Sequence, residues 1–263
     1  MKTKTNGIEL HYELHGKEGA PWLVLSHSLA CSVRMWDPQI AAFKDRYRVL
    51  AFDTRGHGAS DAPAGPYTLE MLADDLHGLL GALGISRAHF CGLSMGGMIG
   101  QTFALKNPGV FASLALADTA SRYPKEAWPA WQERIGVAGS QGMAPLAQPT
   151  LERWFTEPFR KTNAATVEEI RKLILATPVA GYVGCCHAIP RIDVSARLKE
   201  IACPILVLVG EQDPGTPVAM AREIHSNASG SKLTVIPQAA HLSNLEQPEA
   251  FNRALGEFLA GVR

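Results

Sequence analysis

The chain is 263 residues long, and 25 lysines and arginines are balanced by 25 aspartates and glutamates. This length suits one large domain, or one domain with an insertion, and allows a substantial buried core. Because the formal net charge is zero, the chain lacks the basic excess that binding to nucleic acid or to an anionic membrane requires. We therefore expect a globular protein whose partner is a small molecule.

The compartment can be predicted from the N-terminus and the cysteines. The first fifteen residues include Glu9, His11, Glu13 and His15, which do not suit the apolar stretch of a secretory signal. No apolar run approaches the roughly 18 residues of a membrane span. The five cysteines are odd in number and form no CxxC pattern, which favours buried thiols over a zinc site or a disulfide framework. We expect a cytoplasmic protein without a bound metal.

Short apolar runs recur along the chain and predict strands. They lie at residues 22–25, 49–52, 89–93, 114–117, 204–209 and 233–236. Runs without alternation are typical of parallel strands that are covered on both faces. Residues 7–14 alternate instead and predict an antiparallel edge strand.

Helical periodicity separates these runs. Leucines between 69 and 83 repeat with a period of 3.6 residues, after Thr68 as N-cap and before Gly84 as a stop. Residues 251–259 repeat the pattern after Pro248. This alternation of strand and helix signals predicts an open α/β sheet.

Residues 120–201 interrupt that alternation. They contain helical patterns near 128–137, 143–155 and 167–176, and no clear strand. We predict a helical cap, or lid, at 120–201, inserted into a core of residues 1–119 and 202–263. Ligands of open α/β folds bind at the carboxyl ends of the strands, so an insertion there would cover the site.

The sharpest local motif is Gly92-Leu93-Ser94-Met95-Gly96, which follows an apolar run and precedes a helical pattern. A GxSxG sequence in this context is typical of a nucleophile elbow, a strained turn that exposes the serine hydroxyl. Ser94 is therefore the predicted catalytic nucleophile.

A serine nucleophile needs a base and an acid that orients the base. Of nine histidines, His241 follows the predicted last strand and precedes the C-terminal helix, on the same rim as Ser94. Asp213 follows the preceding strand and is the favoured acid, with Asp118 as a rival at a similar position. The predicted catalytic residues are Ser94, Asp213 and His241.

The oxyanion of such a reaction needs backbone donors. The predicted donors are the N–H groups of Leu29, after the first parallel strand, and Met95, after the nucleophile. Two roles are open for His27: it contacts the nucleophile, or it packs in the interior. The turn at 53–61 suits a scaffold role, with Arg55 paired locally. No glycine-rich stretch ends in Gly-Lys-Ser/Thr, so we predict no nucleotide cofactor, and no cofactor of any kind.

With these residues assembled, the chain resembles the α/β-hydrolase superfamily and, more narrowly, the 3-oxoadipate enol-lactonases. The resemblance rests on residues 35–39, 53–61, 89–101, 151–156, 181–182 with 185–186, and 240–248. It implies a mostly parallel eight-stranded sheet with helices on both faces and an inserted helical lid. Ser28 departs from the glycine that many superfamily members have after His27.

The resemblance also implies an activity. The family hydrolyses the enol lactone of 3-oxoadipate to 3-oxoadipate in the β-ketoadipate pathway of aromatic catabolism, without a cofactor. Because this substrate carries a carboxylate, the lid should offer a cation. Arg134 is the candidate, with Trp131 and Trp154 as pocket walls and Arg153 and Arg34 as rivals. The alternatives are a general carboxylesterase or perhydrolase, and a ligand-sensing hydrolase-fold protein with little turnover.

Overall fold

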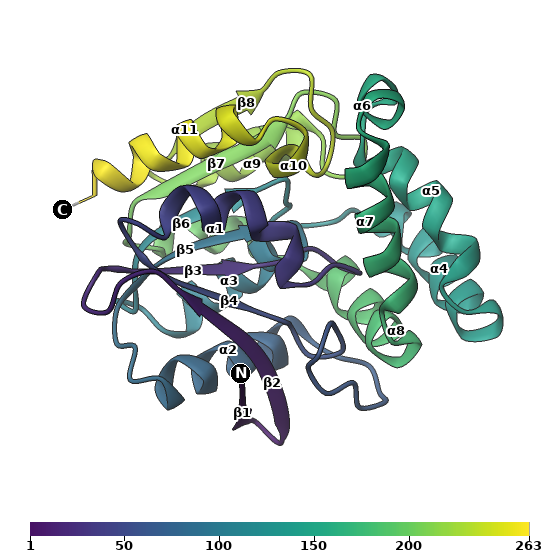
Figure 1. Ribbon diagram of the computed structural model, residues 1–263, viewed down its shortest axis with the longest axis horizontal. Helices are drawn as coiled ribbons and strands as arrows, with labels where there is room; N and C mark the ends of the chain where they lie inside the picture. Colours follow the sequence, from purple (N-terminus) through teal and green to yellow (C-terminus); the bar gives the residue numbers. More distant parts are fainter. Residues whose placement is uncertain (263) are drawn as a thin grey trace.

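The computed structural model describes residues 1–262, in which eight strands form one sheet of order β1-β2-β4-β3-β5-β6-β7-β8 (Figure 1). Strands β3 to β8 pair in parallel, whereas β1 pairs antiparallel with β2, and β2 with β4. The strands are β1 (Lys2–Thr5), β2 (Ile8–His15), β3 (Trp22–Ser26), β4 (Arg48–Phe52), β5 (Ala88–Leu93), β6 (Phe111–Ala117), β7 (Ile205–Gly210) and β8 (Lys232–Ile236). The predicted α/β fold is confirmed.

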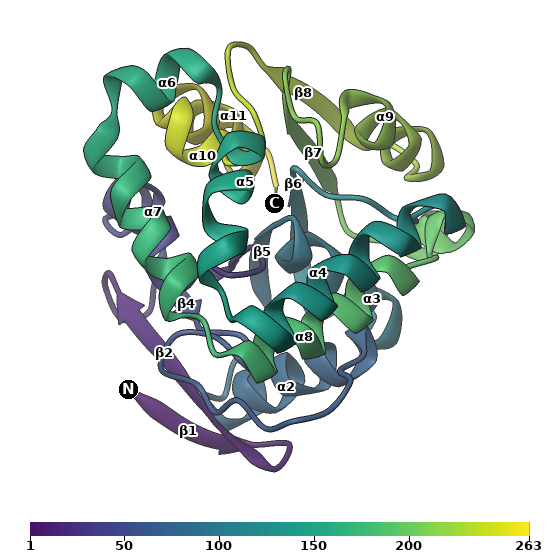
Figure 2. The same ribbon diagram turned by 90° about the vertical axis from the view of Figure 1, so that its right-hand side faces the viewer.

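Helices cover both faces of the sheet. Helices α1 and α11 pack on one face, and α2, α3 and α9 on the other (Figures 1 and 2). The α-helices are α1 (Asp37–Phe43), α2 (Leu69–Ala82), α3 (Met95–Lys106), α4 (Trp128–Gln141), α5 (Ala144–Trp154), α6 (Glu157–Thr162), α7 (Ala164–Ala176), α8 (Val179–Ala188), α9 (Val218–Asn227), α10 (Ser243–Glu246) and α11 (Pro248–Ala260). Short 3₁₀ helices lie at Val33–Trp36, Lys125–Ala127, Ile189–Arg191 and Ser195–Glu200.

The sequence prediction for the N-terminus needs correction. Residues 7–14 were expected to form an edge strand, but β2 lies second from the edge, between β1 and β4. The edge strand is β1, whose four residues Lys-Thr-Lys-Thr are too short and too polar to show an apolar pattern. A charged, short edge strand also discourages pairing with another chain.

The helix after Thr68 forms as predicted. The Thr68 side chain accepts a hydrogen bond from the N–H of Met71 at 3.1 Å, and Gly84 follows the helix with a φ of +66°. The guanidinium of Arg55 pairs with Asp75 of α2, at 2.6 and 2.7 Å, and not with a neighbour in its own turn as expected. This buried pair fastens the turn at 53–61 to the sheet-covering helix.

Aromatic stacking fixes α3 on the sheet. The ring of Phe111 on β6 stacks on Phe90 of β5, with centroids 4.7 Å apart, and on Phe103 of α3, at 4.5 Å. All three side chains are buried. Because α3 begins immediately after Ser94, this packing also sets the direction in which the turn before α3 points.

Helices α4 to α8 lie between β6 and β7 in the sequence and stand together at one side of the sheet (Figures 1 and 2). Three of them, α4, α5 and α7, were predicted. The others were missed, because α6 has six residues and α8 is apolar on nearly all sides. Within residues 1–262 no single helix is long and apolar enough to cross a membrane, although α7 and residues 179–191 together pass that test across a 92° bend.

Candidate active site

The turn between β5 and α3 holds Ser94 in a strained backbone conformation, with φ 55° and ψ −116°. Such a conformation is costly for a residue with a side chain and persists only where its surroundings enforce it. The surroundings here allow no side chain at two positions. A Cβ on Gly92 would lie 2.3 Å from the carbonyl oxygen of Gly96, and one on Gly96 would lie 2.0 Å from that of Ser26. The glycines of the motif are therefore required by close backbone contacts.

His241 and Asp213 form a buried pair. Nδ1 of His241 lies 2.8 Å from Oδ2 of Asp213, which also accepts the hydroxyl of Thr216 at 2.6 Å. The other carboxylate oxygen accepts the N–H groups of Gly215, at 2.8 Å, and Thr216, at 3.1 Å. Since a carboxylate only accepts hydrogen bonds, Nδ1 carries the hydrogen and Nε2 of the neutral ring remains a free base.

The electrostatics of the pair favour its charged form. Burial raises the pKa of Asp213, but the charge of His241 and hydrogen bonds from His241 and Thr216 outweigh it, so the pKa lies below the usual value. Burial lowers the pKa of His241, whereas the charge and hydrogen bond of Asp213 raise it, and the net direction is upward. Both shifts mean that Asp213 stabilises a proton on His241.

Asp118, the rival acid, does not contact His241. One of its oxygens accepts the N–H of Gly210 at 2.7 Å, and the other accepts the hydroxyl of Ser243 at 2.5 Å. Its side chain is fully buried, and burial together with the nearby charge of Asp213 raises its pKa well above the usual value. Asp118 thus fastens the ends of β6 and β7 to the loop that follows His241.

The loop after β3 carries Leu29, whose N–H donates to no residue in the described part of the chain. Met95 is the first residue of α3, so its N–H has no partner within the helix. Two buried histidines support the loop from behind. Nε2 of His57 accepts the N–H of Ala30 at 3.0 Å, and Nε2 of His27 accepts that of Thr54 at 2.9 Å.

These contacts answer the question left open for His27. Its Nδ1 lies 2.7 Å from the carbonyl oxygen of Ser28, and its ring packs against the ring of His57, with the two ring centroids 5.1 Å apart. Burial lowers the pKa of His27, and it lowers the pKa of His57 to about 3, so both rings are neutral acceptors. His27 packs under the loop and does not line the cavity beside Ser94.

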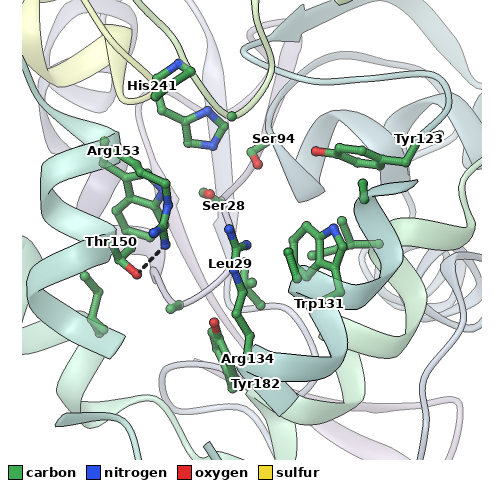
Figure 3. A pocket seen from close by; sticks show the side chains of 18 residues that line it. Ser28, Leu29, Ser94, Tyr123, Trp131, Arg134, Thr150, Arg153, Tyr182 and His241 are labelled. Atoms are coloured by element: carbon green, nitrogen blue, oxygen red, sulfur yellow. Dashed lines mark hydrogen bonds between the residues drawn. The ribbon is translucent and has the colours of Figure 1, made fainter. Parts of the chain in front are cut away.

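A cavity of about 230 Å³ connects these residues with α4, α5, α7 and α8 (Figure 3). It is smaller than the ~300–1,000 Å³ typical of sites for drug-sized ligands. Ser94 and His241 line it together with Leu29 from the loop after β3. Within residues 1–262, no hydrogen bond joins Ser94 to His241, and in catalytic pairs of this kind the contact often tightens only when substrate binds.

Three predicted lid residues line the same cavity: Trp131, Arg134 and Trp154. The guanidinium of Arg134 lies 4.5 Å from the centre of the Trp131 ring, and the ring of Trp154 stacks on His241 with centroids 6.1 Å apart. Arg153 lines the cavity as well and donates to the hydroxyl of Thr150 at 3.2 Å (Figure 3). Within residues 1–262, neither arginine forms a salt bridge with a carboxylate.

Arg34, the third cation considered, lies outside the cavity. It pairs with Glu13 and, at 3.4 Å, with Asp37. Tyr123 and Thr150 also line the cavity but had no signal in the sequence, whereas Tyr182, another lining residue, lies in a stretch on which the resemblance rests. Tyr123 lies five positions before the first residue of α4 and belongs to no motif, so its position depends on how the insertion folds back over the sheet.

Two further features concern metals and thiols. Among residues 1–262, no group of three or more metal-binding side chains is close enough together to hold a metal ion. All five cysteines are free, and the adjacent Cys185 and Cys186 are buried in α8. Burial raises the pKa of both thiols, and that of Cys186 to about 12.

Known proteins share this architecture. A family model described as the alpha/beta hydrolase fold matches residues 21–248. Two enzymes of Acinetobacter baylyi are similar over nearly the whole chain. 3-Oxoadipate enol-lactonase 2 is 40% identical over 94% of this chain and 92% of its own length, and 3-oxoadipate enol-lactonase 1 is 35% identical over 100% and 97%. The crystal structure of the enol-lactonase from Burkholderia xenovorans LB400 has a TM-score of 0.95 and 38% identity, and covers 99% of this chain and 100% of that one.

The chain therefore belongs to the α/β-hydrolase fold family and is a hydrolase. Its resemblance to the 3-oxoadipate enol-lactonases, expected from the sequence, is confirmed over nearly its full length.

Proposed function

We propose that the protein hydrolyses the enol lactone of 3-oxoadipate to 3-oxoadipate, in the β-ketoadipate pathway of aromatic catabolism. The observation that carries the proposal is one small cavity with two kinds of lining residue. Ser94 and His241 line it together with Arg134 of α4 and Arg153 of α5, and neither arginine has a carboxylate partner within residues 1–262. Two cations in the same cavity as a serine suit a small ester that carries a carboxylate. The enol-lactonase relatives support the same substrate.

In the proposed first step, the Ser94 oxygen bonds to the lactone carbonyl carbon while its proton passes to Nε2 of His241. Asp213 stabilises the resulting imidazolium. The carbonyl oxygen becomes negative, and the N–H groups of Leu29 and Met95 donate to it; one such donor contributes about 3–4 kcal/mol. The strained turn holds Ser94 and Met95 in this arrangement, and the positive end of the α3 dipole favours the negative charge on the carbonyl oxygen.

Collapse of the tetrahedral intermediate breaks the bond between the carbonyl carbon and the ring oxygen. The ring oxygen leaves with the electron pair as an enolate, takes the proton from His241, and the enol converts to the 3-oxo group. A water molecule then attacks the acyl-enzyme as His241 accepts its proton, which releases the new carboxylate and restores Ser94. No cofactor takes part in the proposed reaction.

We assign the binding of the substrate's original carboxylate to Arg134, with Trp131 and Trp154 as the walls. Stacking on Trp131 holds the planar guanidinium of Arg134 in place, which suits bidentate contact with a carboxylate. Residues 120–201 would act as a lid on a core of residues 1–119 and 202–263. Their helices α4, α5, α7 and α8 all contribute residues to the cavity, which supports that division.

The test follows the absorbance of the enol lactone with wild type and Ser94→Ala side by side, and with a neutral aryl ester as second substrate. Wild type should turn over the lactone much faster than the ester, and Ser94→Ala should lose up to about 10⁶-fold in kcat. Rapid ester cleavage without lactone turnover would refute the substrate. A stoichiometric burst followed by negligible turnover would instead identify a ligand-sensing protein.

A further inference from the structure

Glu246, the last residue of α10, is a buried carboxylate held by three uncharged donors. Oε1 accepts the N–H and the hydroxyl of Thr156, at 2.9 and 2.7 Å, and Oε2 accepts the N–H of Ala240 at 2.5 Å. The residue is 5% exposed and forms no salt bridge within residues 1–262. Burying a carboxylate is costly unless hydrogen bonds compensate it, so these three bonds must persist for Glu246 to remain in place.

The donors belong to two segments that meet at the candidate active site. Ala240 directly precedes His241. Thr156 caps α6 and follows the end of α5, two residues after Trp154. Residues 237–242, between β8 and α10, form the loop that contains His241, here called the histidine loop. Glu246 therefore joins the histidine loop to the end of α5, which contains Arg153.

A second hydrogen bond joins the same segments on the other side of His241. The N–H of Leu242 donates to the carbonyl oxygen of Trp154 at 3.1 Å, while the Trp154 ring stacks on the imidazole. Close packing also restricts the loop from below, because a Cβ on Gly210 would lie 2.0 Å from the carbonyl oxygen of Ala240. His241 is thus enclosed between two connections to the end of α5.

We propose that Glu246 is a positioning residue that keeps the end of α5, with Arg153 and Trp154, at a set distance from His241. The inference rests on the proposed function, because it treats Arg153 as a contact of the substrate's carboxylate beside Arg134. A substrate held at one end by arginines and attacked at the other needs that distance to be constant. Misplacement of reacting groups by about 1 Å can lower the rate about 10²-fold.

Glu246→Gln tests the inference with little change of volume. The amide oxygen can replace only one carboxylate oxygen, and the amide NH₂ then faces donor groups of Thr156 or Ala240. We expect kcat/KM for the anionic lactone to fall about 10²-fold. Hydrolysis of a neutral aryl ester, which needs no arginine, should fall much less. Glu249→Gln, an exposed change of the same kind three residues later, should leave both rates unaltered.

The pH profile separates positioning from general damage. The contact with Asp213 raises the pKa of His241. A loosened histidine loop weakens this contact and should therefore lower the pKa of His241. The acid limb of kcat/KM should therefore move to lower pH in Glu246→Gln. Equal losses for both substrates with an unmoved acid limb would overturn the inference, as would kinetics like those of the wild type.

Thr156 provides a second variant if Glu246→Gln does not fold. Thr156→Val removes one donor to Glu246 and should change substrate preference and acid limb in the same direction, while Thr156→Ser keeps the hydroxyl and should restore wild-type behaviour. If Thr156→Val behaves like Thr156→Ser, the inference fails. If the wild type cleaves the ester but not the lactone, the proposed function is wrong. The positioning role of Glu246 can still be tested, because the acid limb measured with the ester reports on the pKa of His241.

Discussion

The guanidinium of Arg134 lies over the ring of Trp131, 4.5 Å from its centre, and both side chains line the cavity that contains Ser94. The tryptophan supports the cation without neutralising it, so its charge remains available to a ligand. A salt bridge with a carboxylate of the protein would have neutralised that charge. This difference distinguishes Arg134 from Arg34, which pairs with two carboxylates outside the cavity.

Arg134→Leu should therefore weaken binding of an anionic lactone. A hydrogen bond to a charged group contributes about 1.5–3 kcal/mol, which corresponds to a roughly 10- to 150-fold rise in KM. Hydrolysis of a neutral ester should change little, and Arg34→Leu is the matched control. Steady-state kinetics with both substrates checks the prediction, and an equal loss for the two substrates would contradict it.

The two buried aspartates near His241 should differ sharply in their effect on the rate. Asp213→Asn removes the acceptor that holds the Nδ1–H tautomer and should lower kcat by about 10⁴-fold. Asp118→Asn should cost less than about tenfold, because Asp118 does not contact the imidazole and an amide oxygen can still accept a hydrogen bond from Gly210 or Ser243. Measured kcat values in the reverse order would assign the acid to Asp118.

Activity should fall on the acid side of a pKa above 6.5. His241 acts as a base only when neutral, and Asp213 raises its pKa above the usual value of 6.5. As the pH falls through that raised pKa, the fraction of neutral His241 decreases, and kcat/KM decreases with it. A pH–rate profile from pH 5 to 9 checks this, and a flat profile below pH 6.5 would contradict it.

Much of the fold and part of the site could be predicted because their signals are local. Apolar runs and leucine periodicity predict β3 to β8 and α2, and the glycines around Ser94 mark the turn. Strand order then brings Asp213 and His241 to the same edge of the sheet. Such inferences need only the neighbours of each residue in the chain.

The remainder depends on contacts between distant segments. Glu246 bonds to Thr156, 90 positions earlier in the chain, and to Ala240 in the histidine loop. No sequence pattern at Thr156 or Ala240 predicts these contacts. The same holds for Tyr123, whose access to the cavity depends on how the insertion folds back over the sheet. Strand β1 was missed because four polar residues carry no periodic signal.

Acid should destabilise the fold through His57. Its pKa is lowered from 6.5 to about 3, so the folded state favours the neutral ring. A lowered histidine pKa means that its contribution to the free energy of unfolding is present above pH 6.5 and is lost as the pH falls from 6.5 towards 3. His27, whose pKa is also lowered, acts in the same direction.

Denaturant unfolding between pH 4 and pH 8 tests this with wild type and His57→Gln. The variant should be less stable at pH 8, because it loses buried packing, but its stability should fall less steeply below pH 6.5. His27 accounts for part of the remaining slope. Parallel curves for the two proteins would show that His57 does not contribute to acid sensitivity.

The elbow itself should not tolerate a methyl group at Gly96. A Cβ there would lie 2.0 Å from the carbonyl oxygen of Ser26 and 3.0 Å from that of His27, so α3 would have to move away from β3 and carry Ser94 with it. We expect Gly96→Ala to abolish activity and to lower the free energy of unfolding by more than about 3 kcal/mol, as overpacking of a rigid backbone contact does. Gly139→Ala is the control, because this exposed glycine of α4 has open space around it and alanine should stabilise the helix by about 0.5–1 kcal/mol. Activity and denaturant unfolding of both variants check the prediction, and an active Gly96→Ala enzyme would show that the turn can form without this close contact.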